Sequence, residues 1–170
     1  MVGKGKMNIR LLVTGGTFDK EYNEIDGSLF FKDTHTPEML QLGRCLLPIK
    51  IENLMMIDSL EMSTSHRESI LQACLNCSEN KILITHGTDT MEITAEFLSA
   101  KLAGTEKVVV LTGAMIPYKF GSSDGLFNLG SAIAFCQTLP AGVFIAMNGR
   151  VFPAGKVTKD KSTGVFREKK

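Results

Sequence analysis

The stretch from Ile82 to Glu92 constrains the fold more than any other part of the sequence. Its first three residues form a short apolar run, which indicates a buried strand. A polar turn at His86-Gly87 follows, and Asp89 and Glu92 then have the spacing of a capping pair at a helix start. The expected apolar face of that helix comprises Met91, Ala95, Leu98 and Leu102. In an open parallel sheet, the turn between such a strand and its helix lies at the carboxyl edge, where ligands bind.

The same alternation of strand and helix patterns continues along the chain. The patterns predict further strands at 8–14, 49–57, 108–111 and 142–147, and further helices at 36–45, 65–77 and 124–136. Thr36 is the expected cap of the first helix, and Ser65 to Glu68 have the pattern of a capping box for the second. We expect a loop or loose hairpin at 18–31 and a short hairpin or extended segment at 151–166. The chain, 1–170, is therefore predicted to be one α/β domain, with an open, mostly parallel sheet and helices on both faces.

Composition argues against several classes of protein. A net charge of +1 gives no reason to expect nucleic acid or an anionic membrane as a partner. The apolar stretches are too short for a membrane span, and Leu11 to Val13 are too short for a signal peptide, so we expect a cytoplasmic protein. Cys74 and Cys77 lie within a helical pattern without a second pair, and we interpret them as small buried residues. No metal or cofactor is expected.

Four motifs, in order along the chain, carry a family resemblance. They are Thr14-Gly15-Gly16-Thr17-Phe18, His86-Gly87-Thr88-Asp89-Thr90-Met91, Thr112-Gly113-Ala114-Met115 with the later Ser123-Asp124-Gly125 and Phe127-Asn128-Leu129, and Val157-Thr158-Lys159. Together they span nearly the whole chain and resemble the L-asparaginase family. The resemblance implies a flavodoxin-like α/β domain. It also implies a hydrolase that converts L-asparagine to L-aspartate and ammonia, with glutamine as a possible second substrate.

The hydrolysis of a carboxamide needs a nucleophile, a group that removes its proton, and donors for the oxyanion. The resemblance makes Thr17 the nucleophile and Thr88, Asp89 and Lys159 a catalytic triad; which threonine attacks first stays open. Lys159 acts as a base only when it is neutral. Burial favours the neutral amine, whereas the Asp89 carboxylate favours the ammonium, and the sequence leaves both outcomes open.

Further residues are expected to bind the substrate. Asp58, Ser59 and Glu61 occupy a segment where the family pattern is Gly-Ser-Gln-Asp-Met, and Ser59 matches the residue that holds the substrate's α-carboxylate. Asp58 replaces the glycine of that pattern and Leu60 replaces a polar residue.

The turns after the strands contribute the remaining expected site residues. Gly16 should let the backbone approach the substrate with its N–H groups free. Gly87 belongs to the second motif, and Ala114 matches the residue whose carbonyl faces the leaving ammonia. Tyr22 lies in the segment where the family has a tyrosine that closes over the substrate.

The resemblance also implies a partner. Full-size family members have a carboxy-terminal domain after the segment matching Phe166, and a neighbouring subunit lends an acidic residue to the site. We therefore expect a homo-oligomer. An acid could come from a neighbour's copy of this domain or from Glu21, Glu24 or Asp26; otherwise the activity would be weak. The alternative hypotheses are a non-catalytic amino-acid-binding module and a subunit of an amide-processing complex such as a tRNA-dependent amidotransferase.

Several residues also have simpler structural interpretations. Thr88 and Asp89 could be helix caps, and Lys159 could lie on a solvated strand face. Asp124 is interpreted as a helix cap. His86 is expected to have a structural role near its turn, whereas His35 and His66 are expected on the surface.

Overall fold

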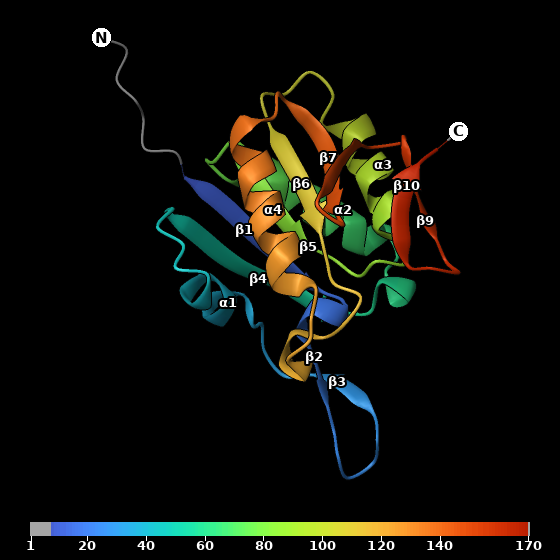
Figure 1. Ribbon diagram of the computed structural model, residues 1–170. Helices are drawn as coiled ribbons and strands as arrows, with labels where there is room; N and C mark the ends of the chain where they lie inside the picture. The colour runs from blue at the N-terminus through green and yellow to red at the C-terminus, as the bar shows by residue number, and fades with distance from the viewer. Residues whose placement is uncertain (1–7, 170) are drawn as a thin grey trace.

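The computed structural model describes residues 8–169. Its central sheet has the strand order β4-β1-β5-β6-β7-β8 (Figure 1). The strands are β1 (Ile9–Gly15), β4 (Ile49–Ile57), β5 (Lys81–Thr85), β6 (Val108–Thr112), β7 (Gly142–Met147) and β8 (Arg150–Pro153). The first five strands in the sheet are parallel, and β8 pairs antiparallel with β7. Along the chain, these five parallel strands have the spatial order 2-1-3-4-5, which is the flavodoxin-like arrangement.

Helices cover both faces of the sheet. The helices α2 (Thr64–Asn76) and α3 (Met91–Lys101) pack on one face, whereas α1 (Thr36–Leu42) and α4 (Gly125–Thr138) pack on the other (Figure 1). Consecutive residues of the central strands therefore point into two different cores, as Ile82 and Leu83 do. This explains why these strands are continuous apolar runs, with both faces buried. The predicted α/β class and mostly parallel sheet are confirmed.

Two hairpins lie outside the sheet. The first, β2 (Lys20–Tyr22) and β3 (Leu29–Phe31), projects away from the body of the domain (Figure 1). The second, β9 (Val157–Asp160) and β10 (Val165–Glu168), contributes Val157 and Phe166 to the core that contains α3. The first hairpin falls within the segment 18–31 where the sequence allowed a hairpin, and the second overlaps the expected segment 151–166 but extends to Glu168. The second is the one that carries Lys159 towards the sheet.

Three predicted helix starts are wrong. The first helix has His35 at its N-cap position, so Thr36 is already helical. The capping box of α2 is formed by Ser63 and His66, rather than by a box beginning at Ser65. Thr90 occupies the N-cap position of α3.

Candidate active site at the ends of β1 and β5

Lys159 joins the hairpin β9–β10 to the turn after β5. Its Nζ atom donates hydrogen bonds to Thr88 Oγ1 and Asp89 Oδ1, each at 2.8 Å. The Lys159 side chain is only 9% exposed, and Thr88 is buried. The structure therefore brings together the three residues of the expected triad, although Lys159 is 70 residues from Asp89 in the chain.

Glu92 explains why Lys159 reaches this position. The carboxylate of Glu92, in the first turn of α3, accepts a hydrogen bond from the backbone N–H of Lys159. The expected capping pair of Asp89 and Glu92 is therefore wrong, because both carboxylates bind Lys159 instead. The sequence did not predict the contact between Glu92 and Lys159, since the two residues lie 67 positions apart.

Thr17 lies at the end of the neighbouring strand, β1. It begins a short 3-10 turn, η1 (Thr17–Asp19), and is half-buried. The residue before it, Gly16, has a φ of 77° and packs against the backbone of Gly87, which precedes Thr88. The expectation of a free N–H at Gly16 is wrong, because this N–H donates to the carbonyl of Ile57 at 3.0 Å. Gly16 instead allows the turns after β1 and β5 to approach each other closely.

Ser59 brings a third strand end, that of β4, to the turns after β1 and β5. It begins the turn η2 (Ser59–Glu61) after β4 and is 2% exposed. A methyl group built on Gly87 would lie 2.6 Å from Ser59 Oγ, so the hydroxyl lies directly against the turn that carries Thr88. The Ser59 carbonyl accepts a hydrogen bond from Thr90 Oγ1 at 2.8 Å. Three strand ends therefore meet at one point, and this point is the switch in strand order where flavodoxin-like folds bind ligands.

The other two residues expected to bind the substrate in this segment, Asp58 and Glu61, do not join the contact between Ser59 and Gly87. Glu61 is exposed, and its neighbour Leu60 is 71% exposed. The Asp58 carboxylate forms an ion pair with Lys20 and also accepts the N–H of Leu60, which caps η2. Bonding to Lys20 lowers the pKa of Asp58 below its usual value. The sequence did not identify Lys20, because its partner lies 38 residues away.

Tyr22 lies on the projecting hairpin and is 53% exposed, with its ring edge-on to Phe120 at a centroid distance of 6.4 Å. Two of the acidic residues expected on this hairpin have different contacts. Glu21 Oε1 lies 3.3 Å from His35 Nε2, whereas Asp26 accepts the N–H of Ser28 at the hairpin turn. His35 is buried, which corrects the expectation that it lies on the surface.

His86 supports the turn after β5. It is fully buried, and burial lowers its pKa to about 4, so the ring is neutral near pH 7. A neutral ring that donates from Nδ1 to the Gly87 carbonyl at 2.7 Å can accept from Thr94 Oγ1 through Nε2 at 2.8 Å. The expected structural role of His86 agrees with these contacts. Arg67, which sequence reasoning missed, also bonds to Thr90 and Thr94 from α2.

The turn after β6 has its own support. Ala114 is buried, and the Asp124 carboxylate accepts hydrogen bonds from the N–H groups of Met115 and Ile116 at 3.0 Å. Asn128 donates to the Gly113 carbonyl and to Asp124, both at 2.9 Å. Asp124 occupies the N-cap position of α4, but its side chain stabilises the preceding loop rather than capping the helix.

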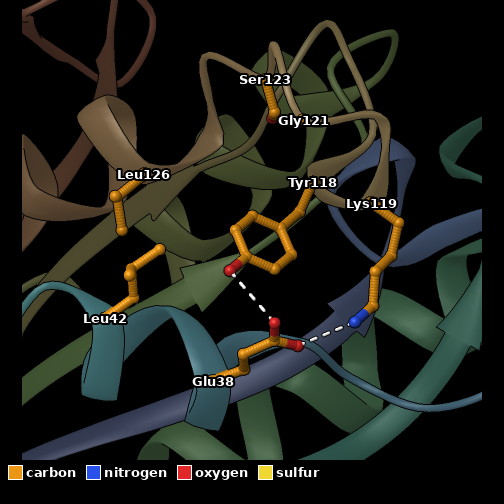
Figure 2. Close-up of a pocket in the computed structure, with 7 residues that line it drawn as sticks. All are labelled: Glu38, Leu42, Tyr118, Lys119, Gly121, Ser123 and Leu126. Atoms are coloured by element: carbon orange, nitrogen blue, oxygen red, sulfur yellow. Dashed lines mark hydrogen bonds and ion pairs between the residues drawn. The ribbon is translucent and has the colours of Figure 1, made fainter.

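An open cleft of about 390 Å³ lies beside the triad. It is lined by Leu60, Asp89, Met115, Lys159, Lys161, Thr163 and Gly164. A second pocket, of about 340 Å³, lies between α1 and the loop before α4, where Glu38 contacts Tyr118 and Lys119 (Figure 2). Only the first contains members of the triad, so it is the candidate entrance to the site.

Within residues 8–169, no group of three or more His, Cys, Asp or Glu side chains is arranged to hold a metal ion. Cys74 is buried in α2, and burial raises the pKa of its thiol to about 12. In the same described part of the chain, none of the helices has the length and apolarity needed to cross a membrane.

The sheet order and the hydroxyl, carboxylate and amine groups at its switch point define a flavodoxin-like α/β domain with a polar site at its strand ends. The family model described as "Asparaginase, N-terminal" matches residues 8–167. The chain therefore belongs to the L-asparaginase family and corresponds to its amino-terminal domain.

Comparison with individual relatives shows what share of their length this chain covers. A probable periplasmic L-asparaginase from Haemophilus influenzae is 36% identical over 93% of this chain and 48% of its own length. The structure of the thermostable L-asparaginase from Thermococcus kodakarensis has a TM-score of 0.85 and 28% identity, covering 95% of this chain and 51% of that protein. One subunit of the glutamyl-tRNA(Gln) amidotransferase from Methanococcus vannielii is 33% identical over 85% of this chain and 35% of its own length. The chain thus spans about half the length of the two asparaginases, and about a third of the amidotransferase polypeptide.

Proposed function

We propose that this protein hydrolyses the side-chain amide of L-asparagine, with L-glutamine as a second substrate to test. The observation that carries the proposal is the pair of hydrogen bonds from Lys159 Nζ to Thr88 Oγ1 and Asp89 Oδ1, each at 2.8 Å. A lysine held against a buried hydroxyl can accept its proton when the amine is neutral. Family membership supports the same reaction.

In the proposed mechanism, Thr17 Oγ1 attacks the amide carbon and gives up its proton, which reaches the leaving nitrogen. The C–N bond breaks, ammonia departs, and an ester links the aspartyl group to Thr17. When its amine is neutral, Lys159 takes a proton from water through Thr88 as the water attacks the ester. The C–O bond to Thr17 then breaks, the proton held by Lys159 is returned to the Thr17 oxygen, and L-aspartate leaves. Asp89 keeps the Lys159 side chain in place through Oδ1, and its second oxygen is proposed to bind the substrate's ammonium group.

Ammonia release from L-asparagine tests this function. We expect release by the purified protein, and a loss of at least about a hundredfold in Thr17→Ala, because that variant lacks the attacking oxygen. Thr138→Ala is the matched control, since Thr138 is exposed near the end of α4. An unmodified protein that releases no ammonia at millimolar substrate would rule out this function.

We also propose that the protein works as a homo-oligomer in the cytoplasm. The projecting hairpin exposes Tyr22, Ile25 and Leu29, which are 53%, 90% and 47% exposed, and a second copy could cover these apolar side chains. Sedimentation of a single species with the mass of one chain, at concentrations where the protein is active, would contradict the oligomer.

Similarity to the amidotransferase polypeptide favours one alternative, a role in an amide-processing complex. In that case the ammonia would pass to a partner, and the isolated chain would bind L-asparagine or L-glutamine without efficient turnover. Calorimetric binding of either amino acid with no ammonia release would favour this alternative over the free-standing hydrolase.

A further inference from the structure

Lys20 and Asp58 connect two segments of the candidate site. Lys20 begins β2, three residues after Thr17, and its ammonium group donates to Asp58 Oδ2. Both side chains are partly shielded, with exposed fractions of 17% and 31%. Asp58 Oδ1 accepts the N–H of Leu60 at 3.0 Å, so the carboxylate is held in one orientation. The pair therefore joins the turn that carries Thr17 to the turn that carries Ser59.

Ser59 follows Asp58 directly, and its hydroxyl lies against Gly87. In the part of the chain that the structure describes, the hydroxyl of the buried Ser59 makes no hydrogen bond to another residue, so its O–H is not committed to a protein acceptor. Asp58 places a negative charge one residue away from this donor. An isolated carboxylate at that position would repel any ligand carboxylate that approached Ser59.

The ammonium group of Lys20 cancels this repulsion. We propose that Lys20 is a specificity-determining residue, whose pairing with Asp58 allows the Ser59 subsite to accept the α-carboxylate of an amino-acid substrate. This inference rests on the proposed function for the choice of substrate. It explains how the chain accommodates an aspartate where the L-asparaginase pattern has a glycine. It also gives the first strand of the projecting hairpin a role in recognition.

Calorimetry with two small ligands tests the proposal. L-Aspartate carries the α-carboxylate, whereas β-alanine lacks it but keeps the amine and the other carboxylate. We expect Lys20→Met to weaken L-aspartate binding by about tenfold, because Asp58 is then uncompensated, and to change β-alanine binding by less than about twofold. Lys20→Arg should bind L-aspartate as the unmodified protein does.

The double variant Lys20→Met with Asp58→Asn distinguishes a loss of binding caused by the uncompensated charge of Asp58 from a loss caused by misfolding. Asparagine keeps an acceptor for the Leu60 N–H and removes the negative charge, so this variant should recover most of the L-aspartate affinity. The proposal is overturned by equal weakening for both ligands, by no recovery in the double variant, or by an unmodified protein that does not bind L-aspartate at millimolar concentration.

This test is independent of turnover. If asparagine is not hydrolysed but L-aspartate binding follows the expected pattern, the proposed hydrolase fails and the role of Lys20 stands. If ammonia is released while L-aspartate binding does not respond to Lys20→Met, the role of Lys20 fails and the hydrolase stands.

Discussion

Gly16 and Gly87 lie backbone against backbone, so that a methyl group on Gly16 would be 2.3 Å from the Gly87 nitrogen. This contact joins the residue before Thr17 to the residue before Thr88. The close approach of the two threonine turns therefore depends on the absence of a side chain at Gly16, whereas a side chain at Gly87 would instead clash with Ser59. Each turn also has its own anchor, the Gly16 bond to Ile57 and the His86 bond to Gly87.

Substituting Gly16 with alanine should force these turns apart. Gly16→Ala combines a φ of 77° with a clash against backbone, and we expect a loss of about 2 kcal/mol or more in the free energy of unfolding. Gly104→Ala is the control. Gly104 has a φ of 82°, but in the described part of the chain a methyl group built on it would have no atom within 4 Å. This variant should lose about 1 kcal/mol in the free energy of unfolding, from its backbone conformation alone. Urea unfolding measures both values, and equal losses would contradict the contact.

Asp19 predicts a pH dependence of stability. Its carboxylate is buried and accepts hydrogen bonds from the His35 N–H at 2.8 Å and from Thr34 Oγ1 at 3.1 Å. Burial raises the pKa of Asp19 from 3.8 to about 6. Between these pH values the folded protein binds more protons than the unfolded chain, so stability falls as the pH rises.

The expected loss from this group is about 3 kcal/mol, because each pKa unit corresponds to about 1.4 kcal/mol. Asp19→Asn removes the titrating group and keeps an acceptor. The difference in unfolding free energy between the variant and the unmodified protein should therefore change with pH between about 4 and 6. A constant difference across that range would show that Asp19 does not titrate there.

The sequence predicted the parts of the fold whose signal is local. The bounds of β4 and β7 agree with the expected 49–57 and 142–147, because each strand carries its own apolar pattern. The helix starts were less predictable, since Asp89 and Glu92 bind Lys159, about 70 residues further along the chain. Motifs identified Thr17, Thr88 and Lys159 as candidates. Lys20 and Arg67 could not be found in this way, because only the folded chain shows their partners.

Glu79 predicts an acid-sensitive anchor at the other end of β1. Its buried carboxylate binds Arg10 at 3.1 Å and Lys50 at 3.0 Å. Burial opposes its ionisation, but the bonds from Lys50 and Arg10 outweigh this effect and lower the pKa of Glu79 to about 2. Its folded pKa lies below the unfolded value of 4.5, so this stabilisation is present above pH 4.5 and is lost as the pH falls towards 2.

Removing the negative charge of Glu79 should destabilise the folded protein. We expect Glu79→Gln to lose about 3 kcal/mol in unfolding free energy at neutral pH, because Arg10 is left without this partner. Glu168→Gln, which breaks the exposed pair with Arg150, should lose less than about 1 kcal/mol. Equal effects in thermal or urea unfolding would mean that burial does not strengthen the Glu79 contacts.

Two lysines of the cleft should differ in their effect on turnover. Lys159→Met removes the amine that contacts Thr88, and we expect kcat to fall by a factor of about 10² to 10⁴. Lys161→Met changes an exposed lysine of the same cleft and should leave kcat within about threefold. Ammonia release under saturating L-asparagine distinguishes them. Similar losses in both variants would indicate that the overall positive charge matters rather than the triad.

The most direct test is to trap the covalent intermediate. Thr88→Val should slow attack on the ester more than its formation, so rapid acid quenching after mixing with L-asparagine should leave an aspartyl group on the protein. Peptide mass spectrometry should then place this group on Thr17. An aspartyl group on another residue, or ammonia release by the unmodified protein with no adduct in either form, would contradict the proposed mechanism.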